Sequence, residues 1–197
     1  MNKTGIIILA AGNASRFGKA KQLVQYNHKS LLQHVLDEAV SSGADPVIVV
    51  TGAYAEEITK NISRSSVRIV WNADWPSGMA GSIVTGLREA IREGQVDRVI
   101  ITVSDQPFVS SSLFKKIIET QKETGKPIVA SAYADTIGTP ALFTKIYFDT
   151  LLNLQGEQGA KKILQSNVQQ TAIVDFPEGQ TDIDVPADFE FLLKKKK

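Results

Sequence analysis

Short apolar runs rich in Ile and Val alternate along this chain with segments whose apolar residues recur every three to four positions. The apolar runs predict β-strands over Gly5–Ala10, Pro46–Thr51, Val67–Trp71, Val96–Val103 and Pro127–Ala132. The three-to-four spacing predicts helices over Ser30–Ser42, Tyr54–Ile62, Met79–Arg92 and Ser110–Thr124. Strands that alternate with helices in this way typically form a parallel sheet.

The strands themselves indicate how the helices are placed. Runs such as Ile6–Leu9 and Val47–Val50 are apolar at every position, without the alternation of a strand that has one face in water. Such strands are buried on both faces, so helices must cover both sides of the sheet. We therefore expect an α/β fold of three layers, with a doubly wound and mostly parallel sheet.

The pattern changes after residue 134. Gly138-Thr139-Pro140 interrupts the chain, and we then expect helical segments over Lys145–Asn153 and Glu157–Ser166 and a strand over Thr171–Phe176. The sequence shows no linker or internal repeat, and its 197 residues fit one domain. We predict a single domain over 1–197, in which 1–133 bind the ligand and 134–197 form a small lobe that closes over the crevice at the carboxyl ends of the strands.

The composition narrows the class of protein. Hydrophobic residues make up 43% and charged residues 22% of the chain, as in an ordinary globular protein. The 22 Lys and Arg residues nearly balance the 21 Asp and Glu residues, so no broad basic field would attract nucleic acid or an anionic membrane. There is no cysteine, which excludes disulfides and thiolate chemistry. We expect a cytoplasmic protein whose ligands are small molecules.

The loop that follows the first predicted strand carries candidate chemistry. It runs from Leu9 through Gly12 to Lys21 and consists mostly of small residues. Its backbone N–H groups could cradle a polyphosphate, whose charge Arg16 and Lys21 would neutralise. It is neither the Gly-x-Gly-x-x-Gly dinucleotide motif nor a P-loop. A tight turn made for steric reasons alone is the alternative.

This loop resembles a known family signature, Leu-Ala-Ala-Gly-x-x-x-Arg-x-Gly-x-x-Lys, found in the MobA-like nucleotidyltransferases. The resemblance is strongest to molybdenum cofactor cytidylyltransferases and continues in order along nearly the whole chain. The matching segments are Gln22-Leu23, Asn72–Met79, Ser104-Asp105-Gln106-Pro107, Gly138-Thr139-Pro140, Gly156–Ala160 and Asp182–Pro186. The sequence departs from the family pattern at Ala14, Ser104 and Thr139, where the family usually has Ser, Gly, and His or Asn.

The resemblance implies the Rossmann-like fold of the nucleotide-diphospho-sugar transferases and a magnesium-dependent transfer of CMP from CTP to molybdopterin. It also implies that 134–197 face the acceptor, and that a molybdoenzyme or an insertion chaperone receives the product. By the same resemblance, the nucleotide-binding residues are Leu9, Ala10, Ala11, Gly12, Arg16, Lys21, Gly78 and Ser82, and the acceptor-binding residues are Gln106, Gly138 and Pro140. CTP is favoured over GTP because GTP-using relatives typically carry Gly at the position of Ala11 and Asp-Thr-Pro or Asp-Met-Pro at that of Asp105-Gln106-Pro107.

Asp105 is the main candidate for metal binding. It follows the buried run Val99–Val103, so it lies at the carboxyl end of the sheet, where ligands bind in α/β proteins. Mg²⁺ prefers one or two carboxylates together with water and phosphate oxygens, and Asp184 could supply the second carboxylate. The alternatives are a turn or helix cap at Asp105 and caps at Asp182 and Asp184; we interpret Asp182 as structural.

The expected chemistry needs no general base. A phosphomonoester is largely dianionic at neutral pH, its second pKa being about 6. Catalysis then consists of aligning the acceptor phosphate with the α-phosphorus and neutralising charge, which Arg16, Lys21 and Asp105 with its metal would do.

Other functions remain open. The same chemistry would serve a guanylyltransferase, a sugar-phosphate nucleotidyltransferase or a methylerythritol-phosphate cytidylyltransferase. A non-catalytic nucleotide-binding protein for cofactor insertion, and a nicotinamide-dependent oxidoreductase, are the alternatives from other classes. Trp71 and Trp75 flank a loop near the expected nucleotide site, and buried aromatic side chains that close a strand end are the simpler interpretation.

Overall fold

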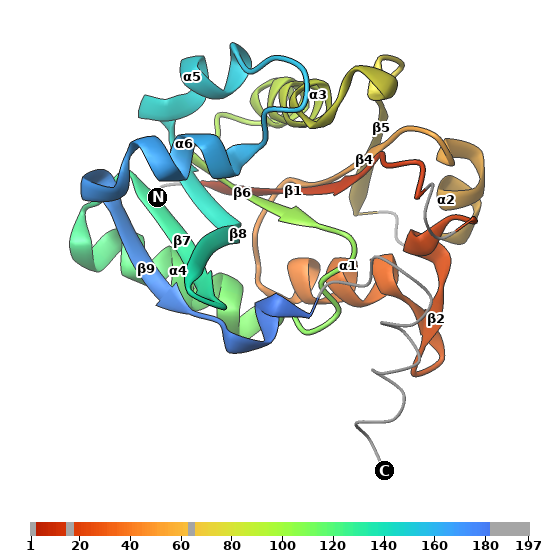
Figure 1. Ribbon diagram of the computed structural model, residues 1–197, viewed down its shortest axis with the longest axis horizontal. Helices are drawn as coiled ribbons and strands as arrows, with labels where there is room; N and C mark the ends of the chain where they lie inside the picture. Colours follow the sequence, from red (N-terminus) through yellow and green to blue (C-terminus); the bar gives the residue numbers. More distant parts are fainter. Residues whose placement is uncertain (1–2, 15–17, 63–65, 182–197) are drawn as a thin grey trace.

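The computed structural model describes residues 3–14, 18–62 and 66–181, which form three layers with a sheet in the middle (Figure 1). Within these residues the sheet has seven strands in the order β5-β4-β1-β6-β8-β7-β9. Their bounds are Thr4–Ala10 (β1), Val47–Thr51 (β4), Val67–Trp71 (β5), Arg98–Val103 (β6), Ile128–Tyr133 (β7), Thr136–Thr144 (β8) and Thr171–Asp175 (β9). A separate small hairpin joins Gln25–Tyr26 (β2) to Lys29–Ser30 (β3).

The sheet is mostly parallel, as predicted. The pairs β1–β4, β1–β6, β4–β5 and β7–β9 are parallel, whereas β8 runs antiparallel to β6 and β7. All strands except β8 therefore point the same way, and their carboxyl ends lie at one edge. The segment after residue 134 adds its strands to this same sheet.

Helices cover both faces of the sheet (Figure 1). Their bounds are Leu31–Ser41 (α1), Ala55–Asn61 (α2), Met79–Glu93 (α3), Ser111–Thr124 (α4), Phe148–Leu152 (α5) and Ala160–Ser166 (α6). Strand β1 is buried throughout because its side chains serve two cores. Ile6 and Ile8 pack in the core with α1 and α4, while Ile7 and Leu9 pack in the core with α3, α5 and α6. The predicted doubly wound α/β arrangement is confirmed.

The sequence did not predict β8. Gly138-Thr139-Pro140 suggests a break in the chain, yet the structure places it inside a strand of nine residues. The physical reason is a shift in register between β7 and β8: Ala130 pairs with Ala141, and the next residue, Ser131, pairs with Gly138. Thr139 and Pro140 are the extra residues of this bulge, where proline needs no N–H for a ladder hydrogen bond.

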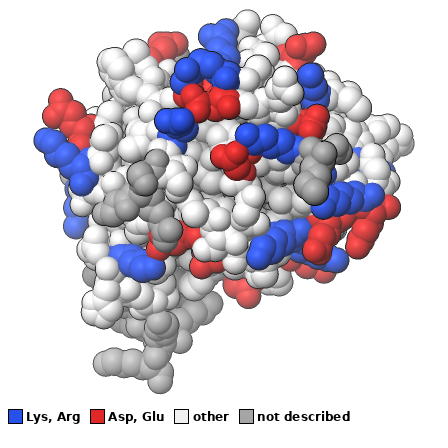
Figure 2. Space-filling model, turned by 180° about the vertical axis from the view of Figure 1, so that it is seen from behind, with Lys and Arg blue, Asp and Glu red and all other residues white. Residues whose placement is uncertain are grey.

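Two further observations bear on the partners of the protein. None of the helices formed by the described residues is both long enough and apolar enough to cross a membrane. On the face seen in Figure 2, Lys and Arg side chains are interspersed with Asp and Glu side chains. Neither sign of charge dominates that face, as the balanced composition predicts.

Candidate active site

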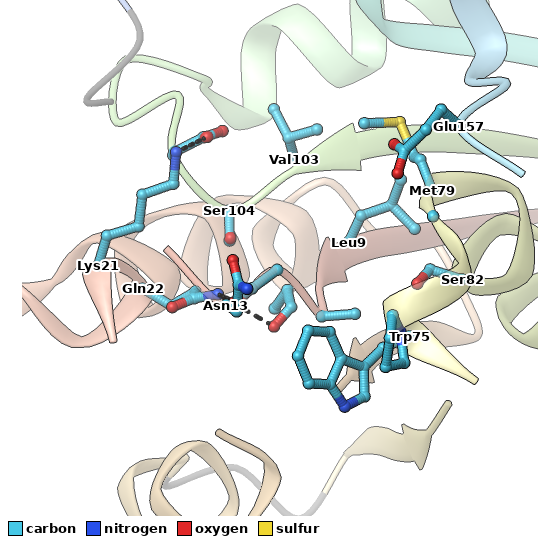
Figure 3. Close-up of a pocket in the computed structure, with 16 residues that line it drawn as sticks. Leu9, Asn13, Lys21, Gln22, Trp75, Met79, Ser82, Val103, Ser104 and Glu157 are labelled. Atoms are coloured by element: carbon cyan, nitrogen blue, oxygen red, sulfur yellow. Dashed lines mark hydrogen bonds and ion pairs between the residues drawn. The ribbon is translucent and has the colours of Figure 1, made fainter. Parts of the chain in front are cut away.

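A pocket of about 350 Å³ lies at the carboxyl edge of the sheet, where β1 and β6 end (Figure 3). In this view Lys21 and Gln22 lie on one side of it, and Trp75, Met79 and Ser82 lie on the other. The pocket is lined by Leu9, Ala10, Ala11, Gly12, Asn13, Lys21, Gln22, Trp75, Pro76, Gly78, Met79, Ser82, Val103, Ser104, Asp105 and Glu157. It thus brings together the candidate nucleotide-binding residues that the structure describes.

The loop after β1 forms the floor of this first pocket. The backbone N–H groups of Gly12 and Ala14 donate to no residue that the structure describes. A Cβ atom added at Gly12 would meet nothing within 4 Å, so packing in the described part of the chain does not require glycine there. A glycine that faces open space beside unused N–H groups suits the close approach of an anion.

Asp105 and Lys21 form an ion pair, with 2.6 Å between Oδ2 of Asp105 and Nζ of Lys21. Their side chains are only 19% and 15% exposed. Asp105 lies in the turn after β6, and Lys21 begins the short 3₁₀ helix Lys21–Leu23. The helix-cap interpretation of Asp105 is wrong, because the side chain of Ser110 caps α4 by accepting from the N–H of Leu113 at 3.2 Å.

Ser82 lies in the first turns of α3 and is 3% exposed. Asn72, which follows β5, donates from Nδ2 to Ser82 Oγ at 3.1 Å. Because the serine oxygen accepts this hydrogen bond, its own hydrogen remains for a ligand in the pocket. Asn72 belongs to the matching segment Asn72–Met79, but this contact cannot be inferred from sequence alone, since its partner lies ten positions away beyond a short 3₁₀ helix.

Gly78 has a structural role in addition to its place in the pocket wall. Its φ of 114° is one that residues with a side chain rarely adopt, and a Cβ atom there would lie 2.5 Å from the carbonyl oxygen of Gly156. The same carbonyl accepts from the N–H of Ala80 at 3.1 Å. Gly78 therefore lets the segment around Gly156 and Glu157 pack against the start of α3.

The two tryptophans differ in their surroundings. Trp75 lines the first pocket, so a residue that the sequence favoured for packing belongs to the candidate site. Trp71 lies at the end of the edge strand β5 and is 63% exposed. The prediction that it is a buried aromatic is therefore wrong, because an edge strand has no neighbour to cover its end.

A second pocket, of about 550 Å³, adjoins the first. Leu9, Met79, Val103 and Asp105 line both, so the two pockets share a wall at Asp105. The other lining residues of the second pocket are mostly apolar: Ile83, Ile101, Gln106, Tyr133, Ala134, Thr136, Ile137, Gly138, Thr139, Gly159, Ala160, Lys161 and Gln180. Lys161 is the one cationic residue among these described lining residues, and it forms no ion pair with any residue described.

The predicted acceptor-side residues have different positions. Gln106 and Gly138 line the second pocket, whereas Pro140 is buried in β8 and is absent from the described lining. Gln106 is only 2% exposed, and its Nε2 donates to the carbonyl oxygen of Gly179 at 2.9 Å. It therefore contributes to the shape of the pocket while tying the chain near Gly179 to the sheet edge.

Two predicted site residues, Arg16 and Asp184, lie outside the described residues, as does Asp182. Within residues 3–14, 18–62 and 66–181 there is no group of three His, Asp or Glu side chains that could hold a metal by themselves. Asp105 offers one carboxylate at the pocket wall, and a site with Mg²⁺ needs one or two, the remaining ligands being water and phosphate oxygens. The donor chemistry of Asp105 fits such an ion bound together with a nucleotide.

Known proteins are similar to this chain over most of its length. The family model for the MobA-like NTP transferase domain matches residues 6–172. Nicotine blue oxidoreductase of Paenarthrobacter nicotinovorans is 24% identical over 189 residues, which cover 91% of this chain and 90% of the relative. Molybdenum cofactor cytidylyltransferase of Escherichia coli is 23% identical over 190 residues, which cover 96% of this chain and 95% of the relative.

The fold is also found in solved structures. The crystal structure of Rv0371c from Mycobacterium tuberculosis is 25% identical, with a TM-score of 0.84 and coverage of 98% of both chains. A structure of Rv0371c in complex with manganese gives a TM-score of 0.80 at 25% identity and covers 98% of both chains.

Proposed function

Because the chain belongs to the MobA-like NTP transferase family, we propose that it is a cytidylyltransferase that transfers CMP from CTP to the phosphate of molybdopterin and releases pyrophosphate. The main support is the position of Asp105, which lies in the wall between two pockets. A nucleotidyl transfer needs its two substrates to meet at one phosphorus atom. Two adjoining pockets with a charged pair at their boundary suit that requirement.

In this proposal the first pocket holds CTP. The unused N–H groups of Gly12 and Ala14 face its phosphates, and Lys21 neutralises their charge together with Arg16. Ser82 Oγ, which accepts from Asn72, donates its hydrogen to the base or the ribose. The methyl group of Ala11 lines the same pocket and reduces the space available, which favours the smaller pyrimidine over a purine.

The second pocket holds the acceptor. Its lining combines aliphatic side chains with polar ones, which suits a flat heterocycle such as a pterin, with apolar faces and hydrogen-bonding edges. Lys161 is placed to pair with an anionic group of the acceptor. The acceptor phosphate enters at the Asp105 end of this pocket.

The reaction is an in-line displacement. An oxygen of the acceptor phosphate forms a bond to the α-phosphorus of CTP while the bond from that phosphorus to the bridging oxygen breaks, and pyrophosphate leaves with the electron pair. The attacking oxygen is already anionic at neutral pH, so no residue has to remove a proton. Lys21 and Arg16 orient the triphosphate and offset the charge that develops on the leaving group.

A divalent ion would be held by Asp105 and Asp184, and the residues present fit Mg²⁺ or Mn²⁺ equally well in donor chemistry. When bound, such an ion neutralises phosphate charge. Oδ2 of Asp105 forms the ion pair with Lys21. The other carboxylate oxygen forms no hydrogen bond with a described residue and is the one suited to a cation.

The test is pyrophosphate release by the purified protein with molybdopterin, in parallel with CTP, GTP, ATP and UTP and with either Mg²⁺ or Mn²⁺. The proposal expects release with CTP and its loss in Asp105→Asn. Binding of CTP without pyrophosphate release would instead favour a non-catalytic role in cofactor insertion. Release with GTP alone would reassign the protein as a guanylyltransferase.

An oxidoreductase is the second candidate, because nicotine blue oxidoreductase is as similar to this chain as the cytidylyltransferase is. The loop after β1 lacks the dinucleotide-binding motif, which is evidence against a nicotinamide cofactor in that position. Fluorescence of NADH and NADPH on titration with the protein separates the two functions. Saturable binding of either cofactor, with no pyrophosphate release from any nucleotide, would favour the oxidoreductase.

A further inference from the structure

The loop after β1 has an unusual pattern of hydrogen bonds. Every carbonyl from Leu9 to Ala14 accepts a hydrogen bond from elsewhere in the protein. The donors, in order, are the N–H of Ser104 to Leu9 O at 3.1 Å, Gln22 Nε2 to Ala10 O at 3.2 Å, the N–H of Ala53 to Ala11 O at 3.2 Å, Gln22 Nε2 to Gly12 O at 2.9 Å, the hydroxyl of Tyr54 to Asn13 O at 2.9 Å, and the N–H of Gly18 to Ala14 O at 3.1 Å.

This pattern determines where the N–H groups point. In a planar trans peptide the C=O of one residue and the N–H of the next point in opposite directions. The carbonyls of Ala11 and Asn13 are turned toward the protein, so the N–H groups of Gly12 and Ala14 are turned away from it. Neither of these two N–H groups donates to a described residue.

Three of these six hydrogen bonds come from two side chains, those of Gln22 and Tyr54. Gln22 lies in the short helix Lys21–Leu23 and is only 2% exposed. Its Nε2 donates to both the carbonyl of Ala10 and that of Gly12. Its Oε1 is buried and has no hydrogen-bond partner among the described residues. A buried unpaired oxygen is unfavourable, so packing alone does not account for glutamine at this position.

The loop also contains backbone strain that these contacts must hold. Ala14 has a φ of 46°, in the left-handed region that residues other than glycine rarely adopt. Such conformations persist where surrounding contacts impose them, and they cluster at ligand-binding sites. The hydroxyl of Tyr54 fixes the carbonyl that immediately precedes the N–H of Ala14.

We infer that Gln22 and Tyr54 are positioning residues, which hold the loop carbonyls inward so that the N–H groups of the loop are ready to bind the triphosphate. This inference rests on the proposed nucleotide binding and assigns two residues to it. Neither side chain needs to touch the nucleotide to act. Tyr54 acts on the peptide group that carries the N–H of Ala14. Gln22 acts on the two peptide groups that flank the one carrying the N–H of Gly12.

The test uses two variants, each with a matched control. Gln22→Met keeps the length of the side chain and removes the donor, and Gln25→Met makes the same change at an exposed position of strand β2. Tyr54→Phe removes one hydroxyl. Tyr147→Phe does the same away from the pocket, where the hydroxyl donates to Asn167 Oδ1 at 3.0 Å. Calorimetry with Mg²⁺ measures Kd for CTP and for cytidine, which has no phosphate.

We expect Gln22→Met to raise Kd for CTP by about 10- to 100-fold and Tyr54→Phe by about fivefold, because hydrogen bonds to charged groups are lost or misdirected. The Kd for cytidine and both controls should change by less than about twofold. A general loss of structure would weaken cytidine and CTP alike, so the ratio of the two constants separates positioning from stability.

An unchanged Kd for CTP in both variants would overturn the inference, as would equal losses for CTP and cytidine. Failure of the proposed function gives a different result: wild-type protein would bind no nucleotide, while hydrogen exchange at the loop amides would still be faster in Gln22→Met and Tyr54→Phe than in their controls.

Discussion

Replacing Gly12 with alanine should affect stability and catalysis in opposite directions. A Cβ atom at Gly12 meets nothing within 4 Å, and the backbone there is not in the left-handed region. Alanine at a compatible position reduces the conformational freedom of the unfolded chain and stabilises a protein by about 0.4–1 kcal/mol. For a domain of this size, that corresponds to a rise in Tm of about 1–4 °C.

The same methyl group would enter the space from which a phosphate approaches the loop. It projects about 1.5 Å from Cα, and a displacement of about 1 Å at a reacting group can lower the rate by about 100-fold. We therefore expect kcat/KM for CTP to fall by about 100-fold, which is roughly 2.7 kcal/mol. Differential scanning calorimetry and a pyrophosphate-release assay on the same preparation measure the two effects.

Gly52→Ala is the contrasting variant. A Cβ atom there would lie 2.5 Å from the carbonyl oxygen of Ala11 and 2.7 Å from Cβ of Trp75, so the backbone must shift. We expect it to lower the free energy of unfolding by about 1–3 kcal/mol. An unchanged kcat/KM in Gly12→Ala would refute the assignment of this loop as a phosphate cradle. A lowered Tm would refute the reasoning that the added Cβ meets open space.

Three further changes test other parts of the site. Asp105→Asn should lower kcat by at least about 100-fold with little change in Tm, because an amide is a much weaker ligand for Mg²⁺ than a carboxylate. An unchanged kcat in steady-state kinetics would mean that the residue only shapes a turn. Ala11→Gly should raise kcat/KM for GTP relative to CTP by about 3- to 10-fold, since it enlarges the first pocket, and equal turnover ratios would argue against this role. Lys161→Gln should raise KM for the acceptor by about fivefold and leave KM for CTP unchanged, whereas Lys162→Gln, which alters a neighbouring cation outside the second pocket, should change neither.

Most of the fold follows from local pattern. Strand β5 has the predicted bounds, Val67–Trp71, and the fully apolar run of β1 correctly indicates burial on both faces. Helix α4 begins directly after Ser110, whose side chain caps it, as expected for serine ahead of an apolar helical pattern. These features depend on neighbours within a few residues, which is the range over which sequence alone is informative.

The features that the sequence did not reveal depend on tertiary contacts. Gln22 contacts carbonyls ten and twelve positions earlier, and Tyr54 contacts one that is 41 positions earlier. A glutamine or tyrosine that donates to a distant carbonyl has no local signature, since surface residues of the same types are common. The role of Trp75 was obscured for a similar reason, because an aromatic residue beside a strand end is usually part of a core.

Strand β8, which the sequence did not predict, explains how the second pocket is formed. Because β8 runs antiparallel to β6 and β7, its first residues, Thr136 to Gly138, lie at the carboxyl edge of the parallel strands, beside Asp105 and Gln106. If β8 were parallel to its neighbours, its last residues would lie at this edge instead of its first. It would then need a long crossover connection in place of the tight hairpin with β7. Residues of the β7–β8 hairpin line the second pocket, and none of them is among the described lining residues of the first. In the proposed function, we therefore expect the loop after β1 to determine how the nucleotide binds and the adjoining hairpin to determine which acceptor meets it.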